Sequence, residues 1–221
     1  MERSVLTVAS SWGVTLQHES VINDPPGGIG VVLFPGDHYR CDAPLLYYAR
    51  MVSLQRGADV LCLEYGHQVA RVALRGGQDM DQIACESAQA VQRFVRDSHR
   101  RLVFISKSLG TWVAGAVARR CRLSVTHIFL TPVSGAIQAM VQDGGTAIVG
   151  KDDPVFDEIH LGQIVGVDGL DVRVIPGANH GLLIPADYQG SLDALRTVAD
   201  CCHEVLAGVG SVVANERNAQ R

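Results

Sequence analysis

The sequence lacks the features that mark several large classes of protein. No apolar run reaches the roughly 18 residues that a helix needs to cross a bilayer, so we expect no membrane span. Residues 1–12 hold no adequate apolar stretch and no clear cleavage site, so we expect no secretion signal. The net charge is −4, and there is no basic run or interleaving of aromatic and basic residues, which argues against a nucleic-acid partner.

Paired C-x-x-C spacing is also absent, although the chain has six cysteines. They lie mostly inside apolar segments, which predicts reduced thiols and a cytoplasmic protein. We expect neither a metal nor a cofactor, and we interpret the adjacent Cys201 and Cys202 as part of a helix face. The six are Cys41, Cys62, Cys85, Cys121, Cys201 and Cys202.

The composition is that of a folded protein, with 47% hydrophobic and 19% charged residues. A chain of 221 residues can form one sizeable α/β domain around a single core, and it is short for two. We therefore predict a single domain over residues 1–221. Its parts are an edge hairpin and loop in 1–29, a core in 30–207 and a loose tail in 208–221.

Short apolar segments alternate with segments of helical periodicity along the chain. Residues 4–9 and 14–22 alternate loosely and predict an antiparallel hairpin at the edge of a sheet. A helix capped by Asp42, with Pro44 in its first turn, is expected to end near Arg56. The alternation favours a mainly parallel sheet with helices on both faces. Further strands are predicted at 30–34, 58–64, 102–105, 125–130, 146–149 and 172–175, and further helices at 79–95, 111–120 and 192–206.

The stretch RLVFISKSLGTWVAGAV, residues 101–117, joins an apolar strand to a small-residue helix through a serine turn. In a turn this tight the residues two before and two after the apex come close together, so both must be small. Ser106 and Gly110 satisfy this requirement around Ser108, whereas Phe104 would clash if Ser106 were the apex. Ser108 is therefore the candidate nucleophile, and the following helix directs its first N–H groups toward developing negative charge.

The motif S-K-S-L-G resembles the nucleophile elbow of the α/β-hydrolase family, commonly written G-x-S-x-G, with Ser106 in place of the first glycine. A serine hydroxyl needs a base, and His180 in PGANHGL lies just past a predicted core strand, where it can reach the carboxyl edge of the sheet. This loop resembles the family's histidine loop. Six other histidines are interpreted as surface or packed residues: His18, His67, His99, His127, His160 and His203.

A carboxylate that orients the histidine is expected in V-G-K-D-D-P, residues 149–154. The segment resembles the family's acid loop, G-x-x-D, and that register selects Asp153, with Asp152 as the alternative. The chain order Ser108, Asp153, His180 is the order of this family.

The resemblance also implies an oxyanion hole formed by backbone N–H groups. Leu109, directly after the nucleophile, supplies one N–H group. The segment Phe34-Pro35-Gly36-Asp37-His38 resembles the family's H-G-x loop with Pro35 in place of His, so Asp37 supplies the other, with Gly36 or His38 as alternatives. The Asp37 carboxylate is expected to point away from the oxyanion; capping the next helix is one role for it, and the sequence does not decide this role. Gly36, His38, Tyr39 and Leu182 are candidate substrate contacts.

The resemblance covers roughly residues 30–207 and implies a single-domain α/β-hydrolase fold with a Ser-His-Asp triad and no cofactor. It implies a serine hydrolase that cleaves a small-molecule carboxylic ester or thioester through an acyl-enzyme. The link between the strands ending near Leu130 and beginning near Thr146 is about 15 residues, too short for a substantial cap, so we expect an open site and an accessible ester. The alternatives are an acyltransferase or peptidase with the same triad, or a non-catalytic binding or scaffold protein with this fold.

Overall fold

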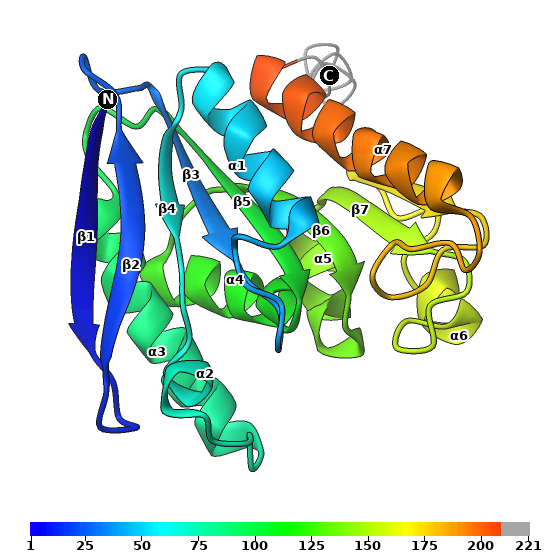
Figure 1. The fold of residues 1–221 in the computed structure, drawn as a ribbon, viewed down its shortest axis with the longest axis horizontal. Coiled ribbons are helices and arrows are strands. Elements are labelled where there is room, and N and C mark those ends of the chain that lie inside the picture. The colour runs from blue at the N-terminus through cyan, green and yellow to red at the C-terminus, as the bar shows by residue number, and fades with distance from the viewer. Residues whose placement is uncertain (209–221) are drawn as a thin grey trace, which may run out of the picture.

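The computed structural model describes residues 1–208 and is built around one twisted sheet. Its strand order is β1-β2-β4-β3-β5-β6-β7-β8 (Figure 1). The pairs from β4 to β8 are all parallel, as the predicted alternation of strands and helices requires. The strands are β1 (Glu2–Ala9), β2 (Thr15–Ile22), β3 (Ile29–Phe34), β4 (Asp59–Cys62), β5 (Arg101–Ser108), β6 (Thr126–Pro132), β7 (Gly145–Gly150) and β8 (Leu170–Ile175).

The N-terminal hairpin forms the edge of the sheet, as predicted. β1 and β2 pair antiparallel in a register that runs from Glu2 opposite Ile22 to Ala9 opposite Thr15. β2 then pairs antiparallel with β4, which attaches the hairpin to the parallel strands. The sheet is therefore mostly parallel with one antiparallel edge.

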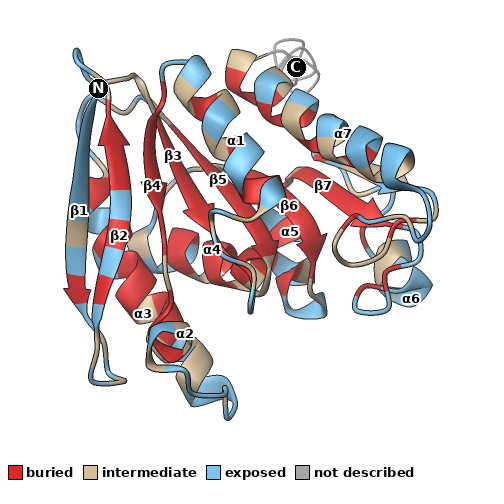
Figure 2. Ribbon diagram, viewed as in Figure 1, coloured by how far each residue is buried: buried red, intermediate tan, exposed pale blue. Residues whose placement is uncertain are grey.

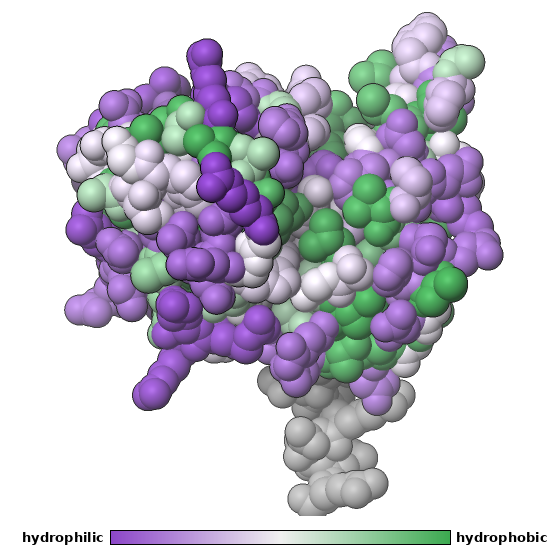
Figure 3. Space-filling view, turned by 90° about the horizontal axis from the view of Figure 1, so that it is seen from below, coloured by the Kyte–Doolittle hydropathy of each residue, from purple (hydrophilic) through white to green (hydrophobic). Residues whose placement is uncertain are grey.

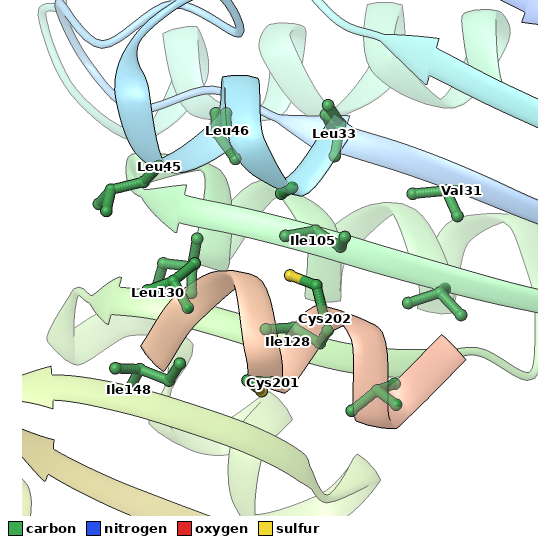
Figure 4. Packing of buried hydrophobic residues seen from close by; sticks show 14 of the residues in the cluster. Val31, Leu33, Leu45, Leu46, Ile105, Ile128, Leu130, Ile148, Cys201 and Cys202 are labelled. Carbon is green, nitrogen blue, oxygen red and sulfur yellow. The ribbon is translucent and has the colours of Figure 1, made fainter. Parts of the chain in front are cut away.

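Helices cover both faces of the sheet, because the parallel strands carry apolar side chains on both sides. α1 (Pro44–Gln55) and α7 (Tyr188–Ala207) pack on one face, where Cys201 and Cys202 enter the core opposite Ile105 and Ile128 (Figure 4). α3 (Gly77–Phe94) and α4 (Leu109–Cys121) pack on the other face. The central strands are buried between these layers, β1 at the edge is mostly exposed, and many exposed residues lie on the outer sides of the helices (Figure 2).

Four short helical segments occur where the sequence predicts only loops. They have fewer apolar positions than a helical period needs to stand out, which explains why the pattern misses them. α5 and the 3-10 turn occupy the link between β6 and β7, so this link is ordered but contains no cap. The segments are α2 (Gly66–Ala70), η1 (Ser134–Ala136), α5 (Ile137–Asp143) and α6 (Glu158–Gly162).

The predicted cap of α1 is wrong. Ala43 occupies the N-cap position and no side chain accepts a hydrogen bond there, while the Asp42 carboxylate lies 3.5 Å from Arg40 Nε. Pro44 at the start of the helix sets its first turn instead, because proline needs no N–H partner there. The predicted loose tail lies almost entirely outside the described residues. Within residues 1–208, no helix combines the length and apolar character that crossing a bilayer requires.

Candidate active site

Ser108 is the last residue of β5 and forms the sharp turn into α4, which begins at the next residue. Its backbone has φ 52° and ψ −121°, which is a strained conformation for any residue other than glycine. The pairing of β5 with β6 also shifts register between Lys107 and Ser108. The chain therefore leaves the sheet at Ser108, with the serine at the carboxyl end of a central strand.

The residues two positions before and after Ser108 explain why the turn can form. A Cβ atom placed on Gly110 would collide with the carbonyl oxygens of Phe34 and Pro35, so α4 can lie against the end of β3 only with glycine here. Ser106 is fully buried, and its hydroxyl donates to the carbonyl of Ile128 at 3.2 Å. Both positions accept only a small side chain.

Ser108, His180 and Asp153 come from three different strand ends and form one line of hydrogen bonds. His180 Nε2 lies 2.8 Å from Ser108 Oγ, and His180 Nδ1 lies 2.7 Å from Asp153 Oδ2. With the ring proton on Nδ1, the carboxylate accepts from the imidazole, and the serine hydroxyl donates to Nε2. A base bonded to the hydroxyl and oriented by a carboxylate is the arrangement that activates a serine.

Asp153 is well prepared to carry a negative charge although its side chain is 0% exposed. Its second oxygen, Oδ1, accepts from the N–H groups of Val155 at 2.8 Å and Phe156 at 3.3 Å. Burial opposes ionisation, but the bonds from His180 and from these N–H groups outweigh it and hold the pKa of Asp153 below its usual value. The neighbouring Asp152 is exposed and makes no side-chain bond to His180.

The loop after β3 lies against the nucleophile. A Cβ atom on Gly36 would come within 3.2 Å of Ser108 Cβ, so glycine permits this approach. The Gly36 N–H donates to the Tyr39 carbonyl at 2.9 Å, and the Tyr39 N–H donates back at 3.3 Å, which closes a tight turn. Because the Gly36 N–H is engaged in this turn, Asp37 and His38 at its tip are left as the candidate oxyanion donors from this loop.

The short helix α2 anchors this loop from the side. Gln68 Nε2 donates to the Gly36 carbonyl at 2.7 Å, and His67 Nε2 lies 3.3 Å from Asp37 Oδ1. The Asp37 carboxylate is thus bound to α2, rather than capping a helix as the sequence suggested. His67 is 3% exposed and was interpreted as a packed residue. No sequence motif marks the two α2 residues as neighbours of the site.

The remaining residues that were predicted to contact substrate differ in how far they are exposed. His38 is exposed, and Tyr39 is half-buried, with its hydroxyl accepting from the Leu45 N–H at 2.9 Å. Leu182, predicted to contact substrate, is 1% exposed and packs in the core beneath α1 and α7. That prediction is wrong, because the loop carrying His180 turns Leu182 inward. Leu183 beside it is 58% exposed.

A cleft of about 1000 Å³ lies next to the loop after β3. Asp37 and His38 line it together with α2 and the ends of β2 and β4, whereas Ser108 and His180 do not. The cleft therefore borders the loop after β3 without being lined by the triad residues. Among the described residues, no three His, Cys, Asp or Glu side chains converge as a metal site would require.

The fold can be compared with solved structures, whereas no protein-family model and no curated protein matches the sequence. A lid-less α/β serine hydrolase from Xanthomonas campestris superposes with a TM-score of 0.67 at 13% identity, covering 93% of this chain and 95% of its own. A dienelactone hydrolase from Anabaena variabilis gives 0.67 at 19% identity, covering 94% and 99%. An esterase from Pyrococcus furiosus gives 0.62 at 13% identity, covering 90% and 91%.

The chain has the α/β-hydrolase fold. In this α/β-hydrolase fold the loops that follow β3, β5, β7 and β8 meet at one edge of the sheet, where open parallel sheets carry their sites. Lys107 also lies at this edge. The elbow motif does not mark it, because the position before the nucleophile is variable in that motif. It is 3% exposed, and its Nζ donates to the main-chain carbonyl of His180 at 3.0 Å.

Proposed function

We propose that this protein is a serine hydrolase that cleaves a carboxylic ester or thioester through an acyl-enzyme. The observation that supports this most is the pair of hydrogen bonds, 2.8 Å and 2.7 Å, that links Ser108 through His180 to the buried Asp153. A strained serine at a strand end, with a base and a carboxylate in line, has little reason to persist in a protein that only binds.

The proposed reaction has two steps with the same residues in reversed roles. Ser108 Oγ attacks the carbonyl carbon while His180 Nε2 takes the hydroxyl proton, and Asp153 stabilises the imidazolium that forms. The imidazolium then protonates the leaving alcohol or thiol as the acyl–oxygen or acyl–sulfur bond breaks. Water attacks the acyl-enzyme by the same route, and Ser108 regains its proton. No cofactor takes part in this proposal.

The oxyanion of each tetrahedral intermediate would be held by backbone N–H groups. We assign one to Leu109, the first residue of α4, because the first four N–H groups of a helix have no partner within it. The second comes from the turn after β3, where Asp37 is the preferred donor. α2 supports this turn through Gln68, so the donor is fixed before substrate binds.

The substrate is proposed to be small or accessible, since the link between β6 and β7 holds only η1 and α5. Val155 and Leu183 flank Asp153 and His180 in sequence and are 44% and 58% exposed, so they can contact an acyl group. On the face seen from below, apolar residues gather in the middle and on the right, while the left part is mainly hydrophilic (Figure 3). Six free thiols suit a reducing compartment, so the proposal places the protein in the cytoplasm.

Labelling with a fluorophosphonate probe tests the proposal directly. The wild-type chain should form one adduct on Ser108 and hydrolyse p-nitrophenyl acetate. Ser108→Ala should lose both while keeping its melting temperature, and the exposed Ser124→Ala serves as the control that keeps both. Folded wild-type protein without an adduct would remove the basis for catalysis. Adding competing alcohols or amines and analysing the products separates hydrolysis from acyl transfer.

A further inference from the structure

Lysine is rare in this chain, and its placement is unusual. The sequence contains many arginines but only two lysines, Lys107 and Lys151. Lys151 is exposed and pairs with Glu158 at 2.6 Å. Lys107, directly before Ser108, is instead almost completely buried. A buried ammonium group loses much of its hydration, so it persists only where its surroundings compensate for that loss.

The surroundings of Lys107 come from the three loops that carry the other candidate site residues. Its stem packs beside the turn after β3, where a Cβ atom on Gly36 would lie 3.2 Å from Lys107 Cδ. Its Nζ lies 5.1 Å from the centre of the Tyr39 ring, a distance typical of a cation–π contact. The same Nζ donates to the His180 carbonyl, and the charge of Asp153 favours the protonated amine.

Tyr39 is itself held in place, so the contact with Lys107 has a fixed partner. Its hydroxyl accepts from the Leu45 N–H at the start of α1, and its backbone closes the turn with Gly36. The ammonium group therefore lies between the turn that faces Ser108 and the loop that carries His180. Lys107 thus contacts both loops from the nucleophile strand, one through a hydrogen bond and the other through the Tyr39 ring.

We propose that Lys107 is a positioning residue that joins the turn after β3 and the loop after β8 to the nucleophile strand, and so aligns His180 with Ser108. The inference rests on the proposed hydrolase function. An apolar side chain of similar length would fill the same space but could not donate to the His180 carbonyl. The hydrogen bond from Lys107 Nζ holds the main-chain carbonyl of His180, which is the same residue that acts as the base.

This role makes the site sensitive to alkaline pH. Burial lowers the pKa of Lys107 to about 8, and the Asp153 charge only partly opposes this effect. The other titratable groups that face Lys107 are His180 and Tyr39, and burial raises the pKa of Tyr39, so this phenol stays neutral at that pH. Above about pH 8 the amine loses its charge, and its attraction to the Tyr39 ring and to the charge of Asp153 weakens.

The kinetic test compares Lys107→Met and Lys107→Arg with the matched control Lys151→Met. We expect Lys107→Met to lower kcat by about 10- to 100-fold, the range that a small misplacement of a catalytic group produces, with KM changed by less than about 2-fold. The fall of kcat/KM above pH 8 should disappear in Lys107→Met and in Lys107→Arg, whose guanidinium does not titrate there. Lys151→Met should match the wild type.

A second measurement does not depend on turnover. With lysine labelled by ¹³C at Cε, the wild type should show two signals, and Lys151→Met identifies the signal of Lys107. That signal should titrate near pH 8, and the imidazole signals of His180 should shift at the same pH. A folded Lys107→Met variant with wild-type kcat and pH profile would overturn the proposal, as would a Lys107 signal whose titration leaves His180 unchanged. If the wild type hydrolyses no ester, the hydrolase proposal fails and the NMR result still decides the role of Lys107.

Discussion

Replacing Asp153 with asparagine should strongly reduce turnover by forcing the wrong tautomer on His180. Asp153 Oδ1 accepts from two backbone N–H groups, and Oδ2 accepts from His180 Nδ1. In the variant only the amide oxygen can accept from the two N–H groups, so the amide NH₂ must face the imidazole. The ring then accepts at Nδ1 and carries its proton on Nε2, where it can no longer take the proton of Ser108.

The expected loss is about 10⁴-fold in kcat, which is the effect of the same change in other serine triads and corresponds to about 5.5 kcal/mol of transition-state stabilisation. Stability should fall by much less, about 1 to 2 kcal/mol, because the amide oxygen keeps the bonds from the backbone N–H groups while the bond to an ionised carboxylate is lost. The two effects therefore separate in one variant.

The assay is the steady-state hydrolysis of p-nitrophenyl acetate by Asp153→Asn, with urea unfolding and a ¹⁵N spectrum of the His180 ring. Asp152→Asn is the control, because Asp152 is exposed and is the sequence alternative for the same role. An Asp153→Asn variant with less than about a 10-fold loss, or with the ring proton still on Nδ1, would show that Asp153 does not orient the base. A large loss in Asp152→Asn would transfer the role to that residue.

Two further predictions concern stability. Gly110→Ala should lower the unfolding free energy by about 1 to 3 kcal/mol and reduce esterase activity, because the added methyl group collides with the end of β3. Urea unfolding measures the loss of stability. Gly162→Ala is the control and should be neutral or stabilising, because the space around Gly162 is open. Burial, aided by a nearby arginine, lowers the pKa of His18 and His127 to about 4, so the unfolded chain binds more protons than the folded chain between about pH 6.5 and 4. As the pH falls through this range, the unfolding free energy should therefore decrease by up to about 3 kcal/mol per histidine. A folded His127→Phe variant whose unfolding free energy depends on pH as in the wild type would contradict this prediction.

The architecture could be predicted because each central strand is a short apolar run bounded by turn residues. Residues 30–34 and 146–149 have this form, and the strands found there, β3 and β7, extend them by only one residue or two. The hairpin followed from loose alternation before Asp24-Pro25. The order of the strands in space is less accessible from periodicity, because pairing between distant segments leaves no local signal. The resemblance carried by the Ser108 turn implied the fold class, and the sequence predicts only that the hairpin lies at an edge.

The supports of the site could not be predicted in the same way. His67 and Gln68 lie on a five-residue helix, too short to show a period, and their contacts with Asp37 and Gly36 span about 30 positions of the chain. Lys107 carries no motif of its own. Leu182 was predicted to contact substrate because of its place in the His180 loop, whereas its side chain is buried in the core.

Ser106 is where the sequence departs from the family motif, and its environment shows why the departure does not disrupt the turn. The position requires a small residue because it is a fully buried position of β5, two residues before the strained apex. A serine adds one polar group to a fully buried place, which would be costly without a partner. The Ile128 carbonyl accepts its hydroxyl at 3.2 Å, so the hydrogen bond offsets most of that cost. The constraint at this position is therefore on size and hydrogen bonding together, and glycine is only the simplest way to meet it.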